Sequence, residues 1–128
     1  MKITCFENLE LWQQARELAK YIFDITSLEP FCIDYKLRDQ IRSSSGSVMD
    51  NIAEGFERDG NKEFIQFLSI SKGSCGECRT QAYRAFDYKY IDKEILNNIV
   101  YKTTSLGKSI GGFIKYLKRS DLKGTKFM

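Results

Sequence analysis

The sequence contains no histidine, a single proline and no long apolar run. Without imidazole, the chain lacks the base of Ser-His and Cys-His nucleophile pairs, most catalytic zinc sites and the Glu-x-x-His pairs of ferritin-like di-iron bundles. No stretch approaches the roughly 18 continuous apolar residues of a membrane span, and the N-terminus shows no signal-peptide pattern. We therefore expect a soluble protein of the cytoplasm that has no membrane partner, and most familiar enzyme classes are disfavoured.

The composition is that of one ordinary globular domain over residues 1–128. Apolar residues make up 42% of the chain and charged residues 29%, and no internal repeat, low-complexity segment or interdomain linker is evident. Twenty Lys and Arg side chains oppose 17 Asp and Glu, which gives a net charge of +3. This excess is too small to indicate a nucleic-acid-binding protein by itself, so the distribution of charge matters more.

Apolar residues recur at steps of three and four, which is the signature of amphipathic helices. This periodicity predicts four helices, over residues 8–27, 34–57, 61–88 and 92–118. Asn8 and Asp92 are candidate N-caps, and no segment alternates as a strand does. Because the connections are short, we predict an all-α fold, an up-down-up-down antiparallel four-helix bundle, with a frayed tail at residues 120–128.

The four cysteines, Cys5, Cys32, Cys75 and Cys78, are expected to be reduced thiols in the cytosol. Cys75 and Cys78 have CxxC spacing, but within a helix this spacing merely places both on one face. A zinc site would need Cys5 and Cys32 to complete four ligands. We favour small buried core residues for Cys75 and Cys78, and we expect no metal and no cofactor.

Four polar residues of the second helix, Ser47, Asn51, Glu54 and Arg58, are separated by steps of four, three and four, so they line one face. One interpretation is a carboxylate site with Glu54 as base. The other is a structural network that fixes the helix against a neighbour. We favour the structural network, because buried polar groups normally satisfy one another and neither nucleophile nor metal is visible.

The third helix carries glycines at positions 73 and 76, each of which costs about 1 kcal/mol relative to Ala. Small residues allow another backbone to approach closely. An oligomer interface is therefore predicted on the face opposite the core, with the residues Gln66, Ile70, Gly73 and Glu77. The alternative is simply a weakly propagating helix.

Positive charge is concentrated towards the C-terminus, since residues 92–128 carry 8 basic and 3 acidic side chains. Five of the basic side chains fall within an arc of about 100° opposite the apolar face of the fourth helix. This basic stripe consists of Lys93, Lys108, Lys115, Lys118 and Arg119. It is either a solvated outer face or a phosphate-binding face, and Tyr101 and Tyr116 flank it, where they would stack on bases or simply pack.

Three segments go beyond a generic bundle: FENLELWQQA at residues 6–15, SVMDNIAEGF at 47–56 and KEFIQFLSISKGSCGE at 62–77. In this order and spacing they resemble the four-helix-bundle protein family encoded by intervening sequences in bacterial 23S rRNA genes. A relative in fold is the accessory variability protein of diversity-generating retroelements, a basic homopentamer that binds a reverse transcriptase and nucleic acid. The resemblance implies a cytosolic bundle that self-associates, with a pentamer as the best guess, and that has no known enzymatic activity.

Residues and resemblance together lead to two hypotheses. The first is a non-catalytic homo-oligomer that binds RNA, DNA or a nucleic-acid enzyme such as a reverse transcriptase through the basic stripe. The second is a purely structural protein-protein interaction module whose stripe only keeps it soluble. Neither hypothesis includes a small-molecule substrate, and an enzyme is disfavoured because no acid, base and nucleophile converge.

Overall fold

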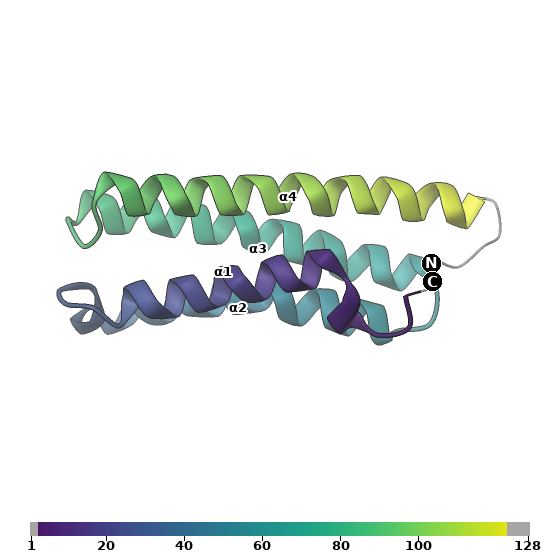
Figure 1. Cartoon of the computed structure of the whole chain (residues 1–128), viewed down its shortest axis with the longest axis horizontal. Coiled ribbons are helices and arrows are strands. Elements are labelled where there is room, and N and C mark those ends of the chain that lie inside the picture. The colour runs from purple at the N-terminus through teal and green to yellow at the C-terminus, as the bar shows by residue number, and fades with distance from the viewer. Residues whose placement is uncertain (1–2, 123–128) are drawn as a thin grey trace.

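The computed structural model describes residues 3–122, which form four α-helices and two short 3-10 turns. The helices are α1 (Glu10–Thr26), α2 (Tyr35–Glu57), α3 (Asn61–Asp87) and α4 (Lys93–Leu122). They run antiparallel to their neighbours in an up-down-up-down bundle (Figure 1). The predicted all-α bundle is confirmed.

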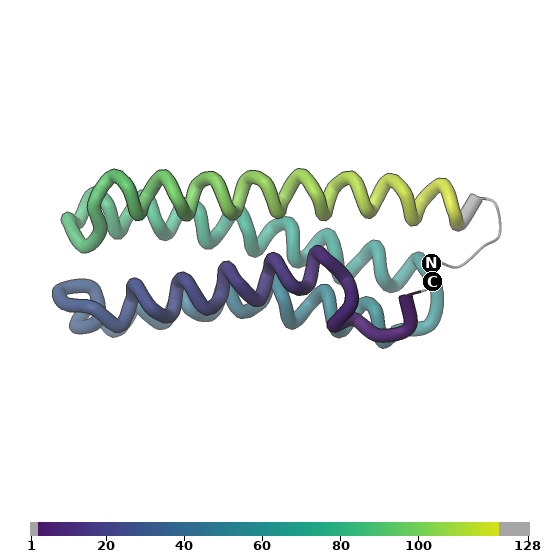
Figure 2. Tube along the Cα trace, viewed as in Figure 1, coloured from purple at the N-terminus to yellow at the C-terminus, as the bar shows by residue number. Residues whose placement is uncertain are grey.

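The apolar stripes that predicted the helices form the core. The side chains that are almost completely buried come from all four helices and include Leu18, Ile22, Leu37, Ile41, Ile52, Leu68, Ile99, Ile110 and Leu117. The Cα trace in Figure 2 shows how nearly parallel the long helix axes run, so each stripe faces its neighbours over most of its length. Burial of these faces supplies the main driving force for folding.

Small residues set how closely α2 and α3 approach. The buried Gly55 of α2 faces Phe64 and Phe67 of α3 directly. Further along the same seam, the hydroxyl of buried Ser71 donates to the carbonyl of Val48 at 2.9 Å. A seam of this kind lets two helix backbones approach more closely than a Leu-lined one would allow.

The α1–α2 and α3–α4 connections meet at one end of the bundle (Figure 1). The Tyr90 hydroxyl donates to Asp34 Oδ2 at 2.9 Å, and the Leu37 N–H donates to Asp34 Oδ1 at 3.1 Å. The hydrogen bond from the Leu37 N–H contributes most, followed by that from the Tyr90 hydroxyl and the charge of Arg84, and together they hold the pKa of Asp34 below its usual value. Asp34 therefore caps α2 and ties the two connections together.

Two details of the predicted boundaries were wrong. Asn8 does not cap α1: it ends a 3-10 turn, Phe6–Asn8, and Leu9 occupies the cap position without a side-chain hydrogen bond. Tail residues 120–122 belong to α4, because the helix continues to Leu122, while 123–128 lie outside the described residues. Asp92, in contrast, accepts from the Ile95 N–H at 2.9 Å, as its predicted capping role requires.

Candidate nucleic-acid interface

The basic stripe of α4 lies on the outer surface of the bundle. Its five members, Lys93, Lys108, Lys115, Lys118 and Arg119, are all exposed. From residue 95 to residue 119 the chain holds no Asp or Glu and five cations, which are Lys102 and the last four members of the stripe. A helix that only keeps a protein soluble usually mixes both signs of charge, so this acid-free length is the most distinctive electrostatic feature of the surface.

The structure divides the stripe into two parts. Lys93 stands at the start of α4, where its ammonium lies 5.4 Å from the ring centroid of Phe86. With a rise of about 1.5 Å per residue, Lys108 follows about 22 Å further along the helix, and Arg119 lies about 17 Å beyond Lys108. Four cations are therefore grouped along the second half of α4, and Lys93 is remote from them.

A cation from α3, Lys72, extends this group. A methyl group at Gly111 of α4 would lie 3.4 Å from Lys72 Cε, so the Lys72 side chain crosses Gly111. Lys108 and Lys115 are three residues before and four residues after Gly111, and hence share its side of the helix. Among the side chains of residues 3–120, no carboxylate forms an ion pair with Lys72, Lys108 or Lys115. Sequence reasoning missed Lys72, because only the packing of α3 on α4 brings it there.

Arg79 fixes α3 against α4 beside this surface. Its Nη1 donates to the Thr104 hydroxyl at 3.2 Å and lies 3.5 Å from the Thr103 hydroxyl. Arg79 is half-buried, so its guanidinium adds positive charge beneath the surface on which Lys72 lies. The basic surface therefore spans two helices.

The four polar residues predicted on the second helix form two pairs, and the last of them, Arg58, lies just after the end of α2. Asn51 Nδ2 lies 2.9 Å from the hydroxyl and from the carbonyl of Ser47, and Arg58 Nε lies 2.9 Å from Glu54 Oε2. The Ser74 hydroxyl donates to that of Ser47 at 3.0 Å, which links this part of α2 to α3. Glu54 is exposed in its pair with Arg58. These contacts agree with a structural role, which nonetheless stays a prediction.

The predicted oligomer face is open in the single chain. Gln66, Ile70, Gly73 and Glu77 are all exposed on α3, and half of the Ile70 surface is accessible. A Cβ at Gly73 would meet no atom within 4 Å. This face is therefore available to a partner, although its use as an interface stays a prediction.

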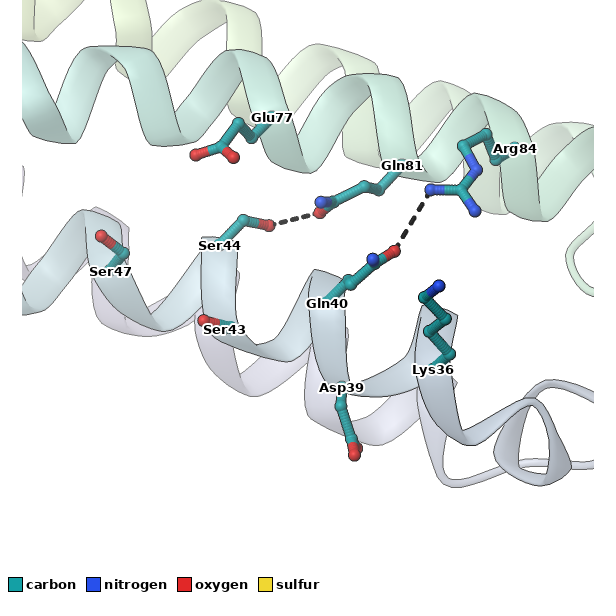
Figure 3. A pocket seen from close by; sticks show the side chains of 9 residues that line it. All are labelled: Lys36, Asp39, Gln40, Ser43, Ser44, Ser47, Glu77, Gln81 and Arg84. Carbon is teal, nitrogen blue, oxygen red and sulfur yellow. Dashed lines mark hydrogen bonds between the residues drawn. The ribbon is translucent and has the colours of Figure 1, made fainter.

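A polar groove of about 680 Å³ lies between α2 and α3 (Figure 3). Ser44 Oγ lies 2.7 Å from Gln81 Oε1, and Arg84 Nη1 donates to Gln40 Oε1 at 3.2 Å. In the view of Figure 3, Lys36 and Arg84 stand at one end of the groove and Glu77 at the other. An amide oxygen cannot take a proton from Ser44, so the contacts drawn there activate no nucleophile.

The cysteines are dispersed over the fold. Cys75 and Cys78 are buried in α3, which confirms them as core residues, and burial raises their pKa values to about 11 and about 12. Cys5 lies before the first 3-10 turn, whereas Cys32 lies in the α1–α2 connection at the opposite end of the bundle. The described residues contain no group of three or more potential metal ligands.

A second groove runs along the seam between α1 and α4. It consists of two adjoining hollows of about 220 and about 390 Å³, which share Gln14 and Ser109. Leu18 and Leu106 contribute apolar lining to the first hollow, and Phe113 does so in the second. Unlike the α2–α3 groove, this one directly borders the helix that carries the basic stripe.

Fold and surface together define a four-helix bundle with a basic two-helix face. No described helix has both the length and the apolarity that a membrane crossing requires. The family model of the 23S rRNA-intervening sequence protein matches residues 7–112, so the chain belongs to this family. The resemblance to this family inferred from the sequence motifs is thereby confirmed, whereas the relation to the retroelement protein stays a prediction.

Similarity to a solved structure supports the fold. It is the crystal structure of a protein of unknown function from the S23 ribosomal protein family of Bacteroides thetaiotaomicron. The two chains share 22% sequence identity, and the match covers 82% of this chain and 98% of the other, with a TM-score of 0.75. No curated protein matches the chain. These comparisons show the family and the fold. Neither the family description nor the solved structure names a catalytic activity.

Proposed function

We propose that this protein is a non-catalytic, self-associating bundle that binds the phosphate backbone of RNA or DNA through the second half of α4. The observation that carries the proposal is the acid-free length of residues 95–119, whose five cations are joined across Gly111 by Lys72 of α3. The family's connection with 23S rRNA genes is consistent with it.

Lysine is well suited to this role. Its ammonium is a point charge on a flexible stem, so it attracts phosphate without selecting a base. Neutralising a phosphate releases condensed counterions, which makes affinity fall steeply as salt rises. The surface predicts binding that depends on charge and varies little with sequence.

Self-association would strengthen this binding. One chain offers only a few phosphate contacts, but copies held in a ring, with five as the expected number, would present the same surface repeatedly to one strand. The exposed face of α3 with Gly73 and Ile70 is where we place the contact between copies. This face leaves the second half of α4 uncovered.

The test is fluorescence anisotropy with labelled RNA and DNA over a salt series. We expect a triple variant, Lys108→Gln, Lys115→Gln and Lys118→Gln, to lose binding. Any residual binding should show a salt slope reduced by about two to three, since each lost phosphate contact removes about 0.7 to 0.9. All three side chains are exposed, so helical content should not change.

A charge-matched control separates a defined surface from overall charge. Lys20→Gln, Lys36→Gln and Lys89→Gln together remove the same charge from exposed positions elsewhere in the chain. This variant should bind as the wild type does. If wild-type protein fails to bind at low salt, or if both triple variants bind equally, the proposal fails and a protein-protein interaction module becomes the better description.

A further inference from the structure

The groove between α1 and α4 has a regular lining on its α4 side. Tyr101, Ser105, Ser109, Gly112 and Tyr116 follow one another at steps of four, four, three and four residues and all line one of the two hollows. The α4 side of the groove therefore carries a tyrosine at each end and small residues between them.

The two tyrosines present aromatic surface at either end. Tyr101 is 73% exposed, and Tyr116 is 43% exposed and stacks on Phe113 with ring centroids 5.9 Å apart. Exposed aromatic faces near cations are what proteins that bind single strands use as stacking platforms, because every base has a π-face. Fifteen residues of helix separate the two rings by about 22 Å, a length that holds about six stacked bases at 3.4 Å each.

The two sides of the groove differ in charge. Glu10 and Glu17 of α1 line the groove on one side. On α4, Lys102 lines the groove. Lys108 and Arg119 follow Tyr101 after about two and five helical turns, so they share its side of the helix. Phosphates are repelled from the carboxylates and attracted to the cations, whereas the amino groups of bases donate to carboxylate and amide oxygens.

We propose that this groove binds single-stranded nucleic acid, with its backbone along Lys108, Lys115 and Arg119 and its bases in the groove, stacked against Tyr101 and Tyr116. The inference rests on the proposed function and adds the form of the nucleic acid. A duplex keeps its bases stacked on one another, so it can use the cations but cannot use the tyrosines.

The experiment compares three labelled 12-nucleotide DNA probes by fluorescence anisotropy: a single strand, the same sequence as a duplex, and an abasic strand with the same phosphates. We expect wild-type protein to bind the single strand at least about fivefold more tightly than the abasic strand, given a stacking contribution of about 1 kcal/mol or more per base.

Tyr101→Ala should reduce affinity for the single strand at least about fivefold and leave binding of the abasic strand and the salt slope unchanged. Tyr101→Phe keeps the ring and should retain the affinity. Tyr35→Ala is the matched control, because Tyr35 is 64% exposed on α2 and lies outside the groove. Gly112→Leu should also weaken binding of the single strand, since open space above Gly112 would be filled.

The outcomes are distinguishable. If duplex, single strand and abasic strand bind equally well and binding depends on the three lysines, the proposed function stands and the single-strand inference is wrong. If no probe binds, both are wrong. If Tyr101→Ala lowers the oligomeric mass in sedimentation but not the affinity for the single strand, a second copy of the chain occupies the groove, and the inference is likewise overturned.

Discussion

The close approach of α2 and α3 at Gly55 yields a sharp prediction about stability. A Cβ at this position would lie 2.7 Å from Phe67 Cβ and 2.9 Å from Phe64 Cδ1. Carbon atoms in contact normally stand about 3.5 to 4.0 Å apart, so one of the helices would have to move by most of an ångström. Gly55→Ala therefore tests whether the two backbones pack as closely as the structure shows.

The magnitude follows from two opposing effects. Overpacking a well-filled site costs about 1 to 3 kcal/mol, and replacing glycine by alanine in a helix returns at most about 1 kcal/mol. We expect Gly55→Ala to lower the free energy of unfolding by about 1 to 2 kcal/mol. In a chain of this size the melting temperature should fall by roughly 3 to 6 °C per kcal/mol.

Gly46 in the same helix provides the control. A Cβ at Gly46 meets no atom within 4 Å, so Gly46→Ala gains helix propensity without a clash. This variant should be more stable than wild type by about 0.5 to 1 kcal/mol. The assay is urea unfolding followed by circular dichroism at one fixed protein concentration. If Gly55→Ala is as stabilising as Gly46→Ala, the argument for a closely packed α2–α3 seam is refuted.

Three further predictions concern thiols, pH and assembly. Because burial raises the pKa values of Cys75 and Cys78 to about 11 and about 12, both should resist iodoacetamide at about pH 8 until urea unfolds the chain, and mass spectrometry that finds both labelled in folded protein would contradict this. The lowered pKa of Asp34 means that its carboxylate stabilises the fold above its unfolded pKa and that this contribution is lost as pH falls through the folded value. Tyr90→Phe removes one of its hydrogen bonds, so the urea midpoints of variant and wild type should differ near neutral pH and converge as the pH falls below the folded-state pKa of Asp34; a constant difference would count against the linkage. Gly73→Leu should reduce the sedimenting mass of an assembly larger than the 14.9 kDa chain without unfolding the subunit, and a wild-type protein that is monomeric at every concentration would exclude the assembly itself.

The sequence by itself determined the helices, the core and the family. Apolar spacing is a local property, so a helix can be recognised wherever its stripe is regular. The predicted cap at Asp92 is likewise set by residues next to it in the chain. The predicted start of α1 was wrong because it relied on local chemistry alone. Asn8 is a residue type that often caps helices, but the chain enters α1 through a 3-10 turn that no sequence pattern predicted.

Only the tertiary structure decided which surfaces the helices make together. Lys72 lies far from Lys108 in sequence and joins its surface because α3 packs on α4 and places the Lys72 side chain over Gly111. Gly55 belongs to a motif that the sequence shows, but the sequence does not explain why glycine stands there. The explanation is the close contact with Phe64 and Phe67, which exists only when α3 packs on α2. The α1–α4 groove likewise depends on two helices from opposite ends of the chain. Apolar periodicity predicts which face of a helix points into the core. Which residues of other helices lie beside that face is decided only by how the helices pack together.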